Sequence, residues 1–386
     1  MTYKNIILLG ATGSIGTSTL NLIRKKREKF NLIGVSTYEK TEQLKLISKE
    51  FNVKNVCFFK NDKDIIFNKS TRVLKGHDGL LELASLNCDI VVSGISGLAG
   101  LMPAYTAINN GNNIAIANKE PLVVAGNILI ECSKKNNVKI LPVDSEHNSI
   151  FQCFDNNLRE NVSHITLTAS GGPFLNRSLN SFREITIEEA LKHPKWKMGK
   201  KISIDSSTMM NKIFELIEAQ KLFDIPQNKL DILIHPESLV HAIVELKNGL
   251  VQFIYHETSM IIPLANAIYD GKININEFLK LKKKKNYIGI RNLNFRTVKQ
   301  KIFPVVKIKK RINEYPSTPI IINACNEILV DQFLQKKIPF LSISKIIMGI
   351  LNDKNYRKYA IKTPKNINQI FKIDLWARNK TKEFIN

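Results

Sequence analysis

Short apolar runs alternate with helix-like stretches up to residue 143, and this alternation restricts the fold more than any other feature. The apolar runs are Ile6–Leu9, Leu32–Val35, Val56–Phe59, Ile90–Val92, Ile114–Ala117 and Ile140–Val143. Between them lie stretches such as Thr17–Lys29 and Thr41–Glu50, which have helical character. Strands that alternate with helices form a mostly parallel sheet joined by right-handed crossovers. We therefore predict an α/β fold with an N-terminal Rossmann-like, doubly wound sheet, whose ligands bind at the carboxyl ends of the strands.

A glycine-rich turn follows the first apolar run. The residues from Gly10 to Gly16 read GATGSIG and lead into a predicted helix. Glycines there allow a tight turn, and they let backbone N–H groups at the helix N-terminus approach a pyrophosphate. The turn predicts dinucleotide binding, with a purely structural turn as the alternative. No acid stands directly at the end of the second run, which favours NADP over NAD, although Glu39 and Lys40 follow at once.

The remainder of the chain has a different pattern. Strand signals at His164–Thr168, Asp231–Ile234 and Leu250–Tyr255 surround a strong helix signal at Ser207–Phe223. Helix signals then dominate, at Ile320–Gln335, Ile343–Leu351 and Ile367–Lys372. We predict a dinucleotide-binding domain (1–144), a central catalytic α+β domain (145–269), a linker (270–295) and a C-terminal helical domain (296–386).

The net charge of +23 does not by itself indicate a nucleic-acid partner. The lysines are spread along the whole chain and accompany many Asn and Ile residues, a usage typical of A+T-rich codons. No aromatic residues are interleaved with the basic ones as in proteins that bind single strands. The densest run, Lys282–Lys285, lies in the predicted linker. We predict neither a nucleic-acid partner nor a membrane partner.

The sequence predicts a soluble cytoplasmic protein. The first strand begins within a few residues of Met1, which leaves no room for a signal peptide, and no apolar run reaches membrane-spanning length. The five cysteines are scattered and include no C-x-x-C pair. That usage is typical of a reducing compartment rather than of a disulfide framework.

Two acids follow the sixth apolar run. In an extended backbone Asp144 and Glu146 would share one face, roughly 7 Å apart. Carboxylates at that spacing repel each other unless a proton or a cation lies between them. Oxygen ligands suit Mg²⁺ or Mn²⁺ better than zinc. The alternative is a strand end with two solvated acids.

Other polar groups lie where ligands of such a fold bind. Lys119 follows the fifth run and is placed either to reach a nicotinamide ribose and a substrate hydroxyl, or to form a surface pair with Glu120. On the predicted helix, Asn211, Lys212 and Glu215 are neighbours by their spacing. They are either an exposed Lys–Glu pair with an adjacent amide, or a third metal carboxylate with two groups that hold an anionic substrate.

Two further segments have the character of substrate sites. Ser170-Gly171-Gly172 follows a strand and offers a hydroxyl and free backbone N–H groups, as phosphate sites do. Residues 193–199 combine Pro194, Trp196 and Gly199 with lysines, which predicts a mobile loop that closes over the substrate.

In this order the motifs resemble 1-deoxy-D-xylulose 5-phosphate reductoisomerases, enzymes of the non-mevalonate isoprenoid pathway. The resemblance is carried by GATGSIG (10–16), ANKEPLV (117–123), LPVDSEHNSIFQ (141–152), SGGPF (170–174), HPKWKMGKKISIDSSTMMNK (193–212), LIHPESLVH (233–241) and NACNEI (323–328). It implies an oxidoreductase that uses NADPH and a divalent metal ion to convert 1-deoxy-D-xylulose 5-phosphate into 2-C-methyl-D-erythritol 4-phosphate. It also implies a homodimer with a dinucleotide domain, a central domain and a C-terminal helical bundle.

The resemblance also assigns roles to single residues. The implied metal ligands are Asp144, Glu146 and Glu215. The implied substrate residues are Lys119, Ser145, Glu146, Ser170, His193, Ser206, Asn211, Lys212 and Glu215, of which Lys119 and Glu146 are catalytic. The implied NADPH residues are Thr12, Gly13, Ser14, Ile15, Asn118, Glu120 and Gly199.

Three positions depart from the family pattern, and none of them is a metal or substrate ligand. Tyr38-Glu39-Lys40 replaces a Gly-x-Asn-type turn, Ile213 replaces a glycine, and Ser259-Met260-Ile261 replaces Asp-Met-Arg. The alternative enzyme is another NAD(P)-dependent dehydrogenase of a phosphorylated substrate, which would not need three carboxylates on a metal. The alternative without enzymatic activity is a basic nucleic-acid-binding protein, which would show steeply salt-dependent affinity.

Overall fold

The computed structural model describes residues 3–60, 65–154, 159–196, 198–269, 271, 274–275, 278 and 292–385. The chain forms two compact units. Unit 1 contains Met1–Pro121, Leu129–Asn148 and Ser259–Gly289, and unit 2 contains Leu122–Ile128, Ser149–Thr258 and Ile290–Asn386. The domain boundaries expected from the sequence stay predictions. Most of the expected linker (270–295), including Lys282–Lys285, lies outside the described residues.

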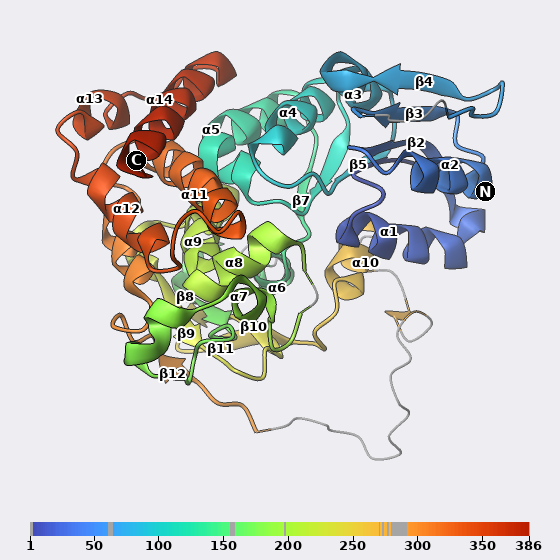
Figure 1. Ribbon diagram of the computed structural model, residues 1–386. Helices are drawn as coiled ribbons and strands as arrows, with labels where there is room; N and C mark the ends of the chain where they lie inside the picture. Colours follow the sequence, from blue (N-terminus) through green and yellow to red (C-terminus); the bar gives the residue numbers. More distant parts are fainter. Residues whose placement is uncertain are drawn as a thin grey trace. The chain divides into compact units, whose positions relative to one another are not determined.

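Unit 1 is built on a parallel sheet, as the alternation predicted (Figure 1). Its strands, in the part of the chain described, are β1 (Lys4–Leu9), β2 (Phe30–Thr37), β3 (Asn55–Phe58), β4 (Arg72–Lys75), β5 (Ile90–Ser93), β6 (Asn113–Ile116) and β7 (Ile140–Pro142). Their order is β4-β3-β2-β1-β5-β6-β7, and every neighbouring pair is parallel. The order reverses between β1 and β5, which is where doubly wound sheets bind ligands. The α/β fold class is confirmed.

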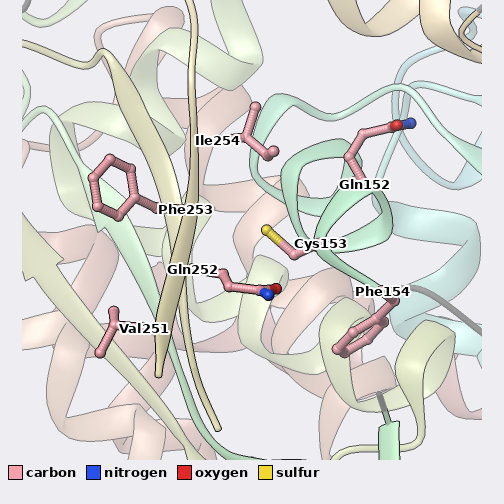
Figure 2. A pocket seen from close by; sticks show the side chains of 7 residues that line it. All are labelled: Gln152, Cys153, Phe154, Val251, Gln252, Phe253 and Ile254. Carbon is pink, nitrogen blue, oxygen red and sulfur yellow. The ribbon is translucent and has the colours of Figure 1, made fainter. Parts of the chain in front are cut away.

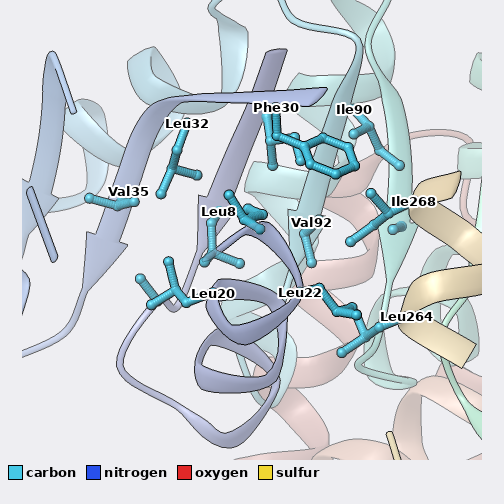
Figure 3. Packing of buried hydrophobic residues seen from close by; sticks show 14 of the residues in the cluster. Leu8, Leu20, Leu22, Phe30, Leu32, Val35, Ile90, Val92, Leu264 and Ile268 are labelled. Atoms are coloured by element: carbon cyan, nitrogen blue, oxygen red, sulfur yellow. The ribbon is translucent and has the colours of Figure 1, made fainter. Parts of the chain in front are cut away.

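Helices cover both faces of this sheet. The helices α1 (Ser14–Lys25), α2 (Thr41–Phe51) and α10 (Ile261–Tyr269) pack their apolar residues on one face, against Leu8, Leu32 and Val92 (Figure 3). The helix α3 (Gly76–Ser85) packs on the opposite face, where the side chain of Leu83 approaches Gly34 of β2. The helices α4 (Leu101–Asn109) and α5 (Glu120–Lys135) follow β5 and β6. Burial on both faces explains why the strands are nearly continuous apolar runs.

Unit 2 contains a mixed sheet. The described residues form β8 (Val162–Ala169), β9 (Leu230–Ile234), β10 (Val240–Leu246), β11 (Val251–Tyr255) and β12 (Arg296–Thr297). The strand order is β11-β10-β8-β9-β12, in which only β8 and β9 are parallel. The sequence did not predict β10, β12 or β4.

Unit 2 also contains helices, and those at its C-terminal end pack mainly on one another. The helices are α7 (Ile187–Leu191), α8 (Lys200–Thr208), α9 (Met210–Phe223), α11 (Thr318–Leu334), α12 (Ser342–Leu351), α13 (Tyr356–Ala360) and α14 (Ile367–Ile385). The helix expected over 207–223 is interrupted, because Met209 has a φ of +69° and separates α8 from α9. The Thr208 hydroxyl accepts a hydrogen bond from the Met210 N–H at 3.2 Å and so stabilises the first turn of α9.

The structure can be compared with two expectations, one about disulfide bonds and one about membrane-spanning segments. All five cysteines are buried free thiols, so the prediction that they form no disulfide framework is confirmed. Among the described helices, none is both long and apolar enough to cross a membrane.

Candidate active site

The glycine-rich turn is closely packed at the switch point of the sheet in unit 1. Gly10 follows β1 with a φ of +81°, and a Cβ atom there would lie 2.9 Å from the carbonyl oxygen of Gly94, just beyond β5. A Cβ atom on Gly16 would lie 2.4 Å from the carbonyl oxygen of Ala11. Neither position can hold a larger residue without displacing backbone, so the turn requires glycine at both.

The predicted cofactor residues of this turn surround the N-terminus of α1. Gly13 is the N-cap and supplies no side-chain acceptor, and Ser14 and Ile15 form the first turn, which contains no acid. Thr12 is held by a 2.7 Å hydrogen bond between its hydroxyl and that of Thr37 at the end of β2. Because the first N–H groups of a helix have no partner within the helix, this end suits a phosphate.

Two more of the predicted cofactor residues, Asn118 and Glu120, follow β6 on the same edge of the sheet. The Ser93 hydroxyl donates to the Asn118 side-chain oxygen at 3.3 Å. Glu120 is buried at the first position of α5. Unit 1 thus gathers six of the seven predicted cofactor residues at one edge of its sheet, whereas Gly199 belongs to unit 2.

Asp144 is the centre of a buried charge cluster in unit 1. The ammonium group of Lys119 donates to one of its carboxylate oxygens, and the His147 Nδ1 lies 2.8 Å from the other. The exposed fractions of the Lys119, Asp144 and His147 side chains are 6%, 8% and 0%. The surface-pair interpretation of Lys119 is therefore wrong. His147 was not among the site residues predicted from the sequence, although its i,i+3 spacing from Asp144 was a usable signal.

The backbone at the two acids differs from our expectation. Asp144 and Glu146 do not share a strand face, because α6 (Ser145–Cys153) begins between them. One Asp144 carboxylate oxygen accepts the N–H groups of Glu146 at 3.2 Å and His147 at 3.3 Å, as an N-capping residue does. Carboxylate oxygens of the two acids still lie within 4.8 Å of one another, and the Ser145 hydroxyl donates to Glu146 at 2.5 Å.

In unit 2, Ser170 and His193 are joined by hydrogen bonds. The His193 Nδ1 accepts the backbone N–H groups of Lys195 at 3.1 Å and Trp196 at 2.9 Å, so Nδ1 carries no proton. The Nε2 atom lies 3.0 Å from the Ser170 hydroxyl, which also accepts the Gly172 N–H. His193 is therefore the Nε2–H tautomer that donates to Ser170, and it fixes the start of the predicted mobile loop.

The loop itself is partly described. Lys197 lies outside the described residues. The Trp196 ring is half-buried and meets the His241 ring edge to face, with 6.2 Å between ring centres. Gly199 is the N-cap of α8. The predicted closure of this loop stays a prediction.

The α8–α9 region brings the other predicted substrate residues together. A Cβ atom on Gly172 would lie 3.1 Å from the Ser206 carbonyl oxygen, so the Ser170-Gly171-Gly172 segment approaches the end of α8. On α9, Glu215 accepts hydrogen bonds from the Asn211 amide and, at 2.6 Å, from the Lys212 ammonium. Lys212 and Glu215 are buried, so the exposed-pair interpretation is wrong.

The fold and the cofactor edge of unit 1 define the class of the protein. A doubly wound parallel sheet whose first strand runs through a glycine-rich turn into a helix is typical of dinucleotide-binding Rossmann proteins. The buried carboxylates beside its strand ends add a second kind of chemistry.

Comparison with known proteins identifies the family. The profile "1-deoxy-D-xylulose 5-phosphate reductoisomerase" matches residues 6–126, and two C-terminal-domain profiles of the same enzyme match 140–223 and 257–380. The reductoisomerase of Thermoanaerobacter pseudethanolicus is 42% identical over 366 residues, covering 91% of this chain and 93% of that protein. The chain belongs to the 1-deoxy-D-xylulose 5-phosphate reductoisomerase family.

Solved structures agree with this assignment. A DOX-P reductoisomerase in complex with NADPH, fosmidomycin and magnesium superposes with a TM-score of 0.90 at 32% identity, covering 99% of this chain and 98% of that one. The Zymomonas mobilis reductoisomerase in complex with NADPH gives 0.87 at 34% identity, with both chains fully covered.

Proposed function

We propose that this protein converts 1-deoxy-D-xylulose 5-phosphate into 2-C-methyl-D-erythritol 4-phosphate by a metal-dependent rearrangement followed by reduction with NADPH. The reaction provides a precursor for isoprenoid biosynthesis. The observation that carries the proposal is 42% identity to a reductoisomerase over 91% of the chain. The cofactor edge of unit 1 and the buried carboxylates of both units supply groups that this chemistry needs.

The donor set suits a divalent ion. Asp144 and Glu146 offer carboxylate oxygens within 4.8 Å of one another, and Glu215 offers the third carboxylate. Three hard oxygen donors favour Mg²⁺ or Mn²⁺ over softer metals. We assign these acids as the metal ligands, with Glu146 also beside the reacting atoms. Such an ion supplies positive charge to the substrate carbonyl and hydroxyl oxygens during the rearrangement.

The side chains of the protein orient the substrate and control its protons. Lys119 holds a proton on its Nζ atom against Asp144 and presents it to a substrate hydroxyl. The Nε2–H of His193 directs the Ser170 hydroxyl, and Ser170 binds the substrate phosphate together with Ser206, Asn211 and Lys212. Ser145 supports the same substrate beside Glu146. Contacts with a remote phosphate provide orientation at the reacting carbons.

The cofactor edge of unit 1 would hold NADPH. NADPH supplies the hydride for the reduction. Its pyrophosphate fits the N-terminus of α1 at Thr12, Gly13, Ser14 and Ile15, where the turn leaves backbone N–H groups available. Asn118 and Glu120, which follow β6, are assigned to the nicotinamide side. Gly199, the N-cap residue of α8, is assigned to the cofactor as well.

A single assay tests the proposed function. Purified protein is mixed with NADPH, and absorbance at the NADPH band is followed after addition of 1-deoxy-D-xylulose 5-phosphate, with and without Mn²⁺. We expect oxidation that requires both the sugar phosphate and the ion. Oxidation that persists in excess chelator would instead favour an ordinary dehydrogenase of a phosphorylated substrate.

We further propose that the protein acts as a homodimer that pairs through unit 2. The strand β11 is an edge of its sheet, and Val251 and Phe253 are about half exposed, at 56% and 47%. An open groove of about 610 Å³ runs beside this strand and is lined by Gln152, Cys153, Phe154, Val251, Gln252, Phe253 and Ile254. Figure 2 shows Gln252 and Ile254 directed toward Cys153, whereas Val251 and Phe253 lie on the other side of the strand.

An exposed apolar edge strand is a template for pairing with another chain, and a second copy satisfies it by symmetry. Sedimentation of the wild type should give a dimer, and Phe253→Asp should shift the equilibrium toward monomer. Leu46→Asp, at an exposed apolar position on α2 of unit 1, is the control. A wild type that sediments as a monomer at micromolar concentration would contradict the proposal.

For the cellular location we propose the cytoplasm. Burial raises the pKa of the Cys57 and Cys88 thiols to about 12, so these groups stay protonated and unreactive at neutral pH. Free buried thiols of this kind are usual in reducing compartments. Fractionation of cells that express the protein at its native level tests the location.

A further inference from the structure

An exposed aromatic pair stands at the carboxyl edge of the sheet in unit 1, and one of its members, Tyr38, belongs to a segment that departs from the family pattern. Tyr38 directly follows β2 and Phe59 directly follows β3, and their side chains are 58% and 37% exposed. The two rings stack with 5.6 Å between their centres and 28° between their planes. Stacked rings left open to solvent offer a flat apolar surface for another planar group.

Hydrogen bonds connect this pair to the glycine-rich turn. The Tyr38 carbonyl accepts the backbone N–H groups of Phe59 at 3.0 Å and Lys60 at 2.9 Å, which locks the ends of β2 and β3 together. The Ser36 carbonyl accepts the Ala11 N–H at 2.8 Å, and Thr37 bonds to Thr12. The aromatic pair therefore stands one residue beyond the groups that anchor the turn, on the same edge of the sheet.

The charge beside the rings is positive. The Lys60 ammonium lies over the Tyr38 ring, 5.4 Å from its centre, and the side chain is exposed. Lys40 is also exposed and immediately precedes α2 as its N-cap residue. A cofactor with a free ribose 2′-hydroxyl is usually met here by an acid, whereas a 2′-phosphate requires cations. Glu39 lies between Tyr38 and Lys40 in the chain, and its side chain is exposed.

We propose that Tyr38 and Phe59 form the platform for the adenine ring of NADPH, and that Lys60, with Lys40, selects its 2′-phosphate. The proposal rests on the NADPH dependence given above, and it gives a role to the Tyr38-Glu39-Lys40 departure from the family pattern. An aromatic surface beside an ammonium group is complementary to adenosine 2′-phosphate, which joins a planar base to a dianion. NADPH and NADH both contain adenine, but only NADPH has the 2′-phosphate. Substitutions of the aromatic residues and of the lysines should therefore have separable effects.

The test compares kcat/KM for NADPH and NADH. Lys60→Ala should lower the value for NADPH by about 10- to 100-fold and leave that for NADH unchanged, because only NADPH carries the extra phosphate. Tyr38→Leu and Phe59→Leu should lower both values by a similar factor, about tenfold. Lys54→Ala is the matched control, since Lys54 is exposed at the opposite end of β3 and should change neither value.

Calorimetric binding of adenosine 2′,5′-bisphosphate separates this inference from the proposed reaction, because it needs no turnover. The bisphosphate should bind the wild type, weaken with Lys60→Ala and not with Lys54→Ala, whether or not the sugar phosphate is consumed. If the enzyme turns over with NADPH while Lys60→Ala keeps its cofactor preference and its bisphosphate affinity, the inference is overturned and the proposed function stands.

Discussion

Two regions among the described residues contain buried or partly buried ion pairs, and the comparison shows that burial of charge does not by itself define a site. In the proposed active site, Lys119 pairs with Asp144 in unit 1 and Lys212 pairs with Glu215 in unit 2. All four side chains are at most 8% exposed. Both pairs lie at the beginnings of helices or the ends of strands, where backbone groups are also available to ligands.

The second region is the C-terminal triad, formed by Glu327 of α11 with Asp374 and Arg378 of α14. The Arg378 guanidinium donates to Glu327 and, at 2.6 Å, to Asp374. Asp374 and Arg378 are four residues apart on one helix, and Glu327 faces them from the helix packed alongside. Here the charged side chains connect two helices, and each of the three residues lies within its helix rather than at a helix end.

The difference is therefore one of position and of arrangement, because each region has one carboxylate more than it has cations. The triad has a guanidinium that bonds both of its acids, so it fixes a packing arrangement. The site contains Glu146 as an additional carboxylate close to Asp144, which a bound cation would balance. We expect substitutions at the site to reduce turnover and substitutions at the triad to reduce stability.

The largest expected effect is on turnover, from Glu215→Gln. The substitution keeps the shape of the side chain and removes one metal charge, so kcat should fall by about 100-fold or more while NADPH still binds. Glu218→Gln is the matched control, because Glu218 is equally buried one turn along α9. Near-normal turnover of Glu215→Gln at limiting Mn²⁺ would remove Glu215 from the ligand set.

Arg378→Met should have the reverse effect and reduce stability rather than turnover. Loss of the guanidinium leaves two partly buried carboxylates without their shared partner, so the free energy of unfolding should fall by about 3 kcal/mol. Turnover per folded molecule should stay close to that of the wild type. Denaturant unfolding and steady-state kinetics on the same preparation measure both quantities, and unchanged stability with lost turnover would reverse our assignment of roles.

A smaller effect concerns pH and Asp374. Burial, with a contribution from Glu327, raises the pKa of this carboxyl above its ordinary value of 3.8, although the Arg378 hydrogen bond opposes the shift. The folded protein then holds the proton more tightly than the unfolded chain, so this group's contribution to stability decreases as pH rises from about 3.8 through the raised pKa.

Asp374→Asn should remove this dependence. The difference in unfolding free energy between wild type and variant, measured in denaturant between pH 4 and about pH 6, should therefore decrease with rising pH in that window. A difference that grows with pH would mean that the pKa is lowered in the fold.

The smallest expected effect is spectroscopic and compares the two tryptophans. Trp196 belongs to the loop that begins at His193, whereas Trp376 stacks on Tyr359 in the C-terminal helices with 4.3 Å between ring centres. If the loop closes over a bound ligand, Trp196 emission should shift to shorter wavelength when a phosphonate analogue of the substrate and Mn²⁺ are added. Trp376→Phe isolates this signal, and Trp196→Phe shows that Trp376 does not respond. Unchanged emission and iodide quenching of Trp196 would exclude a lid.

The fold of unit 1 was predictable because both faces of its sheet are covered. Burial on both faces makes the strands recognisable as apolar runs, and the helices between them have the required length. The strand β4 has the burial pattern of an edge strand, with only Leu74 buried, and it gave no such signal. In unit 2 the interruption at Met209 was not predictable, because a positive φ at a methionine depends on tertiary packing.

The membership of the candidate site was more predictable than its geometry. The residue types and their order indicated the acids and lysines, and the family resemblance assigned their roles. The expectation of a strand at Asp144 and Glu146 was wrong because the Asp144 carboxylate caps α6. The tautomer of His193 depends on two backbone N–H groups that only the folded loop brings to its ring.

The central claim is that carboxylates at the site bind a metal ion and those of the triad do not. Calorimetric titration of Mn²⁺ into metal-free protein measures this directly. We predict one tight site per chain in the wild type and in Glu327→Gln, and a loss of at least about tenfold in affinity in Asp144→Asn and in Glu215→Gln. Wild-type affinity in both site variants, or its loss only in Glu327→Gln, would contradict the account.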